Sequence, residues 1–134
     1  MKKKIAVFDI DGTLFRNSLL IELHWKLVKE GIFPSSVRSD VDELYWAWVN
    51  RERSYDEYIQ RVVDSFHEQI KGKAVQTLNE IAARVVERQS KIVYVFTRDL
   101  IEELRKDHIL IAISGSPNFI VEAFTKKWNF DYAV

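Results

Sequence analysis

The 134-residue sequence lacks cysteine, a net charge and any long hydrophobic run. Without cysteine, a disulfide framework and a thiolate metal site are excluded, and the composition is compatible with the cytoplasm, where we expect the protein. Lysine plus arginine and aspartate plus glutamate number 20 each, so we expect no general nucleic-acid binding. No apolar run is long enough to span a membrane, and 47% hydrophobic residues suit one modest domain with a real core.

The stretch KIAVFDIDGTL, residues 4–14, combines an apolar run with two aspartates. Residues 5–8 are typical of a short buried strand, and Asp9 and Asp11 stand where that strand must end. Carboxylates are costly at the edge of a core unless something compensates them. A bound cation or a chemical role would provide such compensation.

The rest of the chain is mostly helical, with two further apolar stretches. Three helices are expected in the first half of the chain: 18–30 with Asn17 as its cap, 37–50, and one that begins at a capping box of Ser54 and Glu57 and runs through Ile70. A fourth covers 75–86, and the side chains of Val75 and Val86 are expected to face the core. Two more are expected at 98–107 with Thr97 as its cap and from Pro117 onward with Ser116 as its cap. The segment 91–96 fits either a strand or an extended lead-in, 109–113 is a buried strand, and the final FDYAV begins a third.

These elements predict an α/β protein with an incomplete, Rossmann-like parallel sheet of three strands. A parallel crossover needs only about a dozen residues, whereas about a hundred separate the first two strands. We therefore expect a core of residues 1–15 and 91–134, with residues 16–90 inserted as a helical subdomain. Ligands of such sheets bind at the carboxyl ends of the strands, where Asp9, Asp11 and Ser114 are expected to face one another.

Several of these features also have structural interpretations. A D-x-D pair alone is weak evidence for a phosphoryl-transfer site, because such a pair also occurs in ordinary turns and in metal-dependent sugar transferases. Residues 114–117 would likewise suit the start of a helix in any protein. Packing between helices is favoured over a substrate pocket for Trp46 and Trp48. The three histidines are interpreted as non-catalytic: His24, His67 and His108.

The order of the two motifs is more specific than either motif alone. DIDGTL after the first strand and IAISGSP at the second resemble the first two motifs of the haloacid dehalogenase superfamily, in particular its phosphoserine-phosphatase-like branch with a helical cap. The resemblance covers essentially the whole chain, with residues 16–90 as the cap.

The resemblance implies a mechanism and a set of site residues. Asp9 would be the nucleophile that forms an aspartyl-phosphate, and Asp11 the general acid and base. Asp9 and the backbone carbonyl of Asp11 would bind Mg²⁺. Four residues would position the loop and bind the phosphate of a small phosphorylated metabolite: Gly12, Thr13, Ser114 and Gly115.

The sequence also departs from the family's pattern. The acid and the arginine that the branch uses for phosphoserine would fall near Ser18 and Val62, so the leaving group stays open. The motifs that supply a lysine and further acidic metal ligands are expected after Val134. We therefore expect a truncated portion, inactive alone, which self-associates through the open edge of strand 4–8. The alternative is a remnant that binds phosphate or a partner without turnover.

Overall fold

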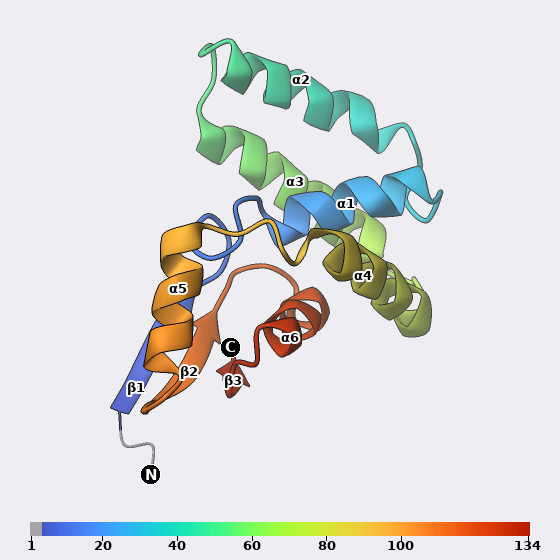
Figure 1. Cartoon of the computed structure of the whole chain (residues 1–134). Coiled ribbons are helices and arrows are strands. Elements are labelled where there is room, and N and C mark those ends of the chain that lie inside the picture. The colour runs from blue at the N-terminus through green and yellow to red at the C-terminus, as the bar shows by residue number, and fades with distance from the viewer. Residues whose placement is uncertain (1–3) are drawn as a thin grey trace. The chain divides into compact units, whose positions relative to one another are not determined.

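The computed structural model describes residues 4–134, which form two compact units (Figure 1). The first comprises the chain up to Leu19 together with Ala82–Val134, and the second comprises Leu20–Ile81. The elements are β1 (Lys4–Asp9), α1 (Leu19–Lys29), α2 (Val37–Val49), α3 (Tyr55–Ile70), α4 (Val75–Gln89), α5 (Val95–Leu104), β2 (His108–Ile113), α6 (Asn118–Lys127) and β3 (Tyr132–Ala133). The α/β class is thereby confirmed, whereas the role of 16–90 as a cap on a core of 1–15 and 91–134 stays a prediction. None of the described helices is long and apolar enough to cross a bilayer.

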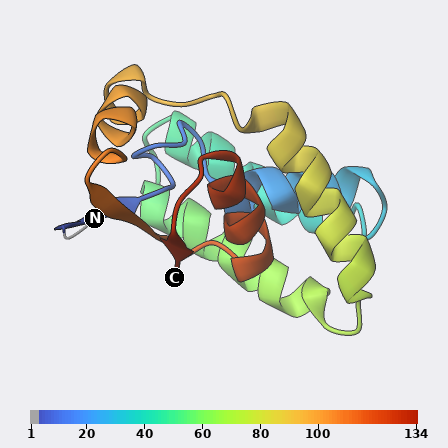
Figure 2. The ribbon, with the colours of Figure 1, turned by 60° about the horizontal axis from the view of Figure 1, so that its bottom comes forward.

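The three strands form one parallel sheet in the order β1-β2-β3. Lys4 lies opposite His108 and Asp9 opposite Ile113, so β1 and β2 pair along their whole length. β3 pairs with β2 near Ile111, and α6, which leads into β3, lies beside it (Figure 2). The predicted three-stranded parallel sheet is therefore confirmed, and its first two strands end at the same edge.

Alternate residues of β1 and β2 differ in exposure. Phe8, Leu110 and Ala112 are buried, whereas Ile5 and Val7 have exposed fractions of 61% and 54%. Since side chains alternate between the two faces of a sheet, one face belongs to the core and the other is apolar surface in residues 4–134. Self-association through the edge of β1 stays a prediction.

The segment before α5 is an extended lead-in rather than a strand. Val93 forms only an isolated bridge with Phe15, and the helix begins at Val95. The expected Thr97 cap is wrong, because this buried residue lies inside α5 and its hydroxyl donates to the carbonyl of Thr13 at 2.8 Å. A buried hydroxyl needs a partner, and here a distant loop provides it.

In the second unit, α1 and α3 contribute a shared apolar core. Leu23 and Leu27 of α1 are fully buried, as is Phe33 in the following turn, and Phe33 packs edge-on against Phe66 of α3 at 5.9 Å between ring centroids. The predicted capping box at the start of α3 is confirmed: the Ser54 hydroxyl accepts from the Glu57 amide, and the Glu57 carboxylate accepts from the Ser54 amide.

Two expectations about inward-facing residues have different outcomes. The sequence predicts Val75 inside, but at the first position of α4 this side chain has an exposed fraction of 71%. Trp48 packs between helices as expected, since its ring stacks on Tyr58 at 5.8 Å between centroids. Trp46, in contrast, has an exposed fraction of 58%.

The end of α6 is closed by a backbone motif and an arginine. The amides of Asn129 and Phe130 donate to the carbonyls of Lys126 and Thr125, and Asn129 takes the left-handed φ of 52° that such a helix end requires. The Arg105 guanidinium donates to the carbonyls of Trp128 and Asn129, both at 2.7 Å. Arg105 thus binds carbonyls that the helix leaves unpaired.

Arg105→Met is expected to lower the free energy of unfolding by about 2 kcal/mol, because it removes charge-assisted hydrogen bonds and leaves two carbonyls without that donor. Urea denaturation measures the effect. The matched control Arg98→Met removes an exposed arginine that, among residues 4–134, pairs only with its neighbour Asp99, and should change the free energy by less than about 0.5 kcal/mol. Equal effects of the two changes would contradict this assignment.

Candidate active site

The carboxyl end of β1 holds the first aspartate. Asp9 is the last residue of the strand and is exposed, between the buried side chains of Phe8 and Ile10. Its carboxylate oxygen Oδ2 accepts from the hydroxyl of Thr13 at 2.7 Å. No other side-chain hydrogen bond reaches Asp9 within residues 4–134, so its second carboxylate oxygen is available to bind a ligand or to react.

A tight turn follows Asp9 and fixes the loop. The Ile10 carbonyl accepts from the amides of Thr13, Leu14 and Phe15. Gly12 has a φ of 79°, in the left-handed region that favours glycine, and its amide donates to the Phe15 carbonyl at 2.8 Å. Because Gly12 uses its amide inside the turn, its contribution here is conformation.

The carboxylate of the second aspartate accepts three hydrogen bonds. The oxygen Oδ2 of Asp11 accepts from the hydroxyls of Ser114 at 2.6 Å and Ser116 at 3.0 Å, and Oδ1 accepts from the Leu19 amide. Leu19 is the first residue of α1, so the Asp11 carboxylate accepts from one of the amides that the start of a helix leaves unpaired. Asp11 therefore joins the loop after β1 to the loop after β2 and to the start of a helix.

The loop after β2 carries the second motif. Besides its bond to Asp11, the Ser114 hydroxyl oxygen accepts from the Ser116 amide at 3.1 Å. Gly115 between them is exposed. The expected Ser116 cap is wrong: Pro117 precedes α6 without a side-chain cap, and the Ser116 hydroxyl is used by Asp11 instead.

The structure thus places the predicted site residues in two hydrogen-bonded groups, one around Asp9 at the end of β1 and one around Asp11 in the loop that follows. Asp11 and Ser114 are in direct contact, and the Thr13 hydroxyl donates to Asp9. Sequence reasoning missed Ser116 and Thr97 as supports of the two loops. Their partners lie 105 and 84 residues away, so no local pattern could have revealed them.

The donors at this edge are hard oxygen atoms, which suit Mg²⁺. An exposed carboxylate with one oxygen not hydrogen-bonded, at Asp9, is the main candidate ligand. In residues 4–134, no group of three or more histidine, cysteine, aspartate or glutamate side chains gathers into a metal site. The fit to Mg²⁺ rests on Asp9 and on the carbonyl of Asp11.

Solved structures with the same fold include proteins of known activity. One of these structures is of a protein of unknown function from Bordetella pertussis Tohama I, which matches 100% of the present chain at 14% identity and a TM-score of 0.68. The present chain also matches two structures of phosphoserine phosphatase, a phospho-aspartyl intermediate analogue and a substrate-bound complex, over 99% of its length at 18% identity and a TM-score of 0.54. The chain spans only 55–60% of the length of these proteins. At such identities the likeness shows the fold alone.

A search of curated protein sequences finds no match. The family comparison is more specific, because the model of the haloacid dehalogenase-like hydrolases matches residues 6–134, which include both aspartates and the whole second motif. With the parallel sheet and the loops at the ends of β1 and β2 in place, we conclude that the chain belongs to the haloacid dehalogenase-like hydrolase family.

Proposed function

We propose that the protein is a Mg²⁺-dependent phosphomonoester hydrolase that acts through an aspartyl-phosphate at Asp9. The observation that carries the proposal is the exposed carboxylate of Asp9, held at one oxygen by Thr13 and located where β1 ends beside β2. One solved neighbour is described as a phospho-aspartyl intermediate analogue of a phosphoserine phosphatase, and the same chemistry is proposed here by analogy.

Asp9 supplies the nucleophile. Its hydrogen bond from Thr13 leaves the second carboxylate oxygen to attack phosphorus, which forms an acyl phosphate as the ester oxygen departs. Water then attacks the same phosphorus, releases inorganic phosphate and restores the carboxylate. The bond from Thr13 keeps the carboxylate in one orientation, which favours in-line attack.

Asp11 supplies the proton transfer. A carboxylate has about four acceptor positions, and Ser114, Ser116 and the Leu19 amide use three of them. One position remains for the proton that passes to the leaving oxygen and is later taken from water. Because the three bonds hold Asp11 in place, proton transfer there needs no large rearrangement.

Mg²⁺ would be held by the Asp9 carboxylate and the Asp11 backbone carbonyl. When bound, it would neutralise charge on the phosphoryl oxygens. The chain's own groups would hold the same phosphate: the Gly115 amide, which lies in an exposed loop, and the hydroxyl of Ser114. That hydroxyl donates to Asp11 in this structure, so it would rotate to donate to phosphate.

The substrate class we propose is a small phosphorylated metabolite in the cytoplasm. Phosphoserine is not favoured, because Arg61, which lies next to the position expected for a carboxylate-binding arginine, already pairs with Asp40 and Glu68 at 3.5 Å. A different leaving group therefore fits this chain better. A screen of phosphomonoesters would identify this leaving group.

The full gene product is expected to release phosphate from at least one member of a panel of phosphomonoesters at neutral pH with Mg²⁺. Chelation by EDTA should reduce release to background, and added Mg²⁺ should restore it, because the phosphoryl charge is otherwise not compensated. Colorimetric phosphate detection measures this. Saturable phosphate binding without release would favour the alternative of a non-catalytic binding protein, and release that resists EDTA would contradict the Mg²⁺ assignment.

A further inference from the structure

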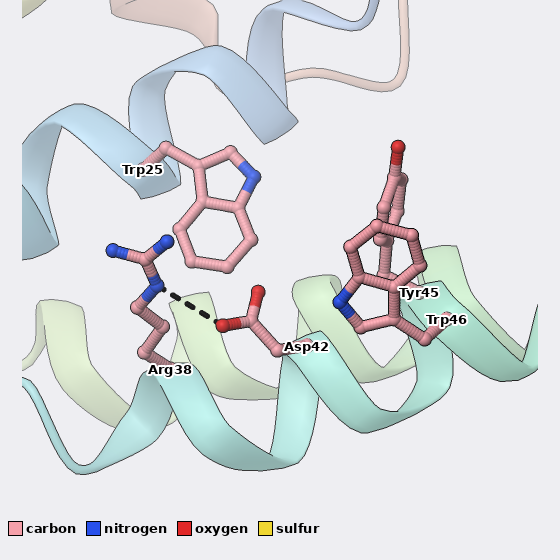
Figure 3. A pocket seen from close by; sticks show the side chains of 5 residues that line it. All are labelled: Trp25, Arg38, Asp42, Tyr45 and Trp46. Carbon is pink, nitrogen blue, oxygen red and sulfur yellow. Dashed lines mark hydrogen bonds and ion pairs between the residues drawn. The ribbon is translucent and has the colours of Figure 1, made fainter.

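The second unit contains a hollow of ≈ 340 Å³, which five side chains of α1 and α2 line: Trp25, Arg38, Asp42, Tyr45 and Trp46. Figure 3 shows Asp42 between Arg38 on one side and the two aromatic rings of α2 on the other, with Trp25 reaching over them from α1. Three of the five side chains are aromatic, and the remaining two carry opposite charges. The lining lies entirely within this unit.

The carboxylate of Asp42 is only partly used by the chain. Its Oδ2 accepts from the Arg38 Nε at 3.0 Å, and no hydrogen bond in residues 4–134 reaches its other oxygen. In Figure 3 that oxygen points away from Arg38, toward the Trp25 side of the hollow. An oxygen of this partly exposed carboxylate therefore lies in a hollow with aromatic walls.

The chain itself shows which charge this environment attracts. The Arg38 guanidinium lies over the Trp25 ring, 5.3 Å from its centroid, which is a cation–π contact. Arg38 lies on the far side of Asp42 from Tyr45 and Trp46, so it does not occupy the space between the carboxylate and these rings (Figure 3).

The rings are also held in place. Tyr45 and Trp46 meet edge to face at 5.2 Å between centroids, and Tyr45 also packs edge-on against the buried Tyr58 ring at 5.5 Å. Burial, with smaller contributions from neighbouring tyrosines and Asp42, raises the pKa of Tyr58 to about 12, so this phenol stays neutral. Asp42 is thus the only anion in the lining of the hollow.

We propose that this hollow binds a small organic ammonium ion, with its charge beside the open oxygen of Asp42 and its alkyl groups against Trp25, Tyr45 and Trp46. Aromatic walls with one carboxylate are the chemistry that recognises such cations. Arg38 bonds one oxygen of Asp42, so an ammonium ion would approach the other, whereas a neutral molecule would cover that oxygen without placing a charge beside it. The inference does not depend on the proposed hydrolase activity.

The test uses the 134-residue chain labelled with ¹⁵N and titrated with tetramethylammonium, while the four tryptophan indole signals are followed by NMR. The Trp25 and Trp46 signals should shift with saturation. The Trp128 signal should not, because that indole belongs to the other unit and donates to the Ser90 carbonyl. Neutral tert-butanol, which has a similar shape, should bind at least about 10-fold more weakly, since it lacks the charge.

Asp42→Asn should weaken tetramethylammonium binding at least about 10-fold, because it removes the only anion in the lining. The matched control Asp40→Asn removes a carboxylate from the same helix that does not line the hollow and pairs with Arg61, so it should change binding less than twofold. The proposal is overturned by an absence of saturable shifts, by equal binding of tert-butanol, or by equal affinities of the two variants. If Asp42→Asn fails to fold, the comparison of the two ligands on the unaltered chain decides.

Discussion

Asp9→Asn is expected to abolish phosphatase turnover of the full gene product, by at least about 10³-fold in kcat. The physical reason is that an amide oxygen is a poor nucleophile, whereas it still accepts the hydrogen bond from Thr13 that orients Asp9. The change therefore removes the charge and keeps the shape and the partner. Initial rates with the best substrate of the panel measure the effect.

Two further measurements separate a nucleophile from a mere metal ligand. Intact-protein mass spectrometry after acid quenching should show one phosphoryl group on the unaltered protein during turnover and none on Asp9→Asn. The control Asp99→Asn removes an exposed aspartate of α5 whose single ion-pair partner in the described part of the chain is Arg98, so it should keep both the rate and the phosphoryl adduct. Substantial turnover by Asp9→Asn at high Mg²⁺ would mean that Asp9 contributes only to metal binding.

The parts of the site that depend on local sequence could be predicted. A short apolar run ending in an aspartate predicted β1 and its end, and the spacing of Ser54 and Glu57 predicted a helix start. Gly12 falls at the turn where a left-handed φ of 79° is needed. In each case the relevant contacts lie within a few residues, so the pattern itself contains the physical cause.

The parts that depend on distant contacts could not be predicted. Ser116 and Thr97 both looked like helix caps, because local hydrogen bonding is the usual use of such residues beside a helix. In the folded chain each hydroxyl instead serves a group in the loop after β1, Asp11 for Ser116 and the Thr13 carbonyl for Thr97. Burial left these hydroxyls without water, and the tertiary fold decided which acceptor they received.

His24 illustrates the same limit in the second unit. The sequence indicated only a histidine on an amphipathic helix, whereas the structure buries it completely and pairs its Nε2 with the Ser65 hydroxyl of α3 at 2.8 Å. Its Nδ1 has no hydrogen-bond partner within the described residues. Burial, together with the positive charge of Arg61, lowers the pKa of His24 from 6.5 to about 4.

This buried imidazole should make the folded state sensitive to acid. Between pH 6.5 and 4 the unfolded chain protonates His24 while the folded chain does not, so the unfolded state binds more protons and stability falls as the pH falls. Above pH 6.5 both states are neutral and the contribution is constant. A shift from 6.5 to about 4 corresponds to a loss of about 3 kcal/mol of unfolding free energy on going from pH 7 to pH 4.

The measurement is urea denaturation of the unaltered chain and of His24→Gln at pH 7 and pH 4. Carboxylates contribute equally to both proteins, so the unaltered chain should lose about 3 kcal/mol more than the variant between these two pH values. The control His67→Gln removes an exposed imidazole of α3 and should retain the larger loss. If His24→Gln is too unstable to study, ¹H NMR of the His24 ring in the unaltered chain still decides, because a midpoint near pH 6.5 would show that the folded state does not exclude the proton.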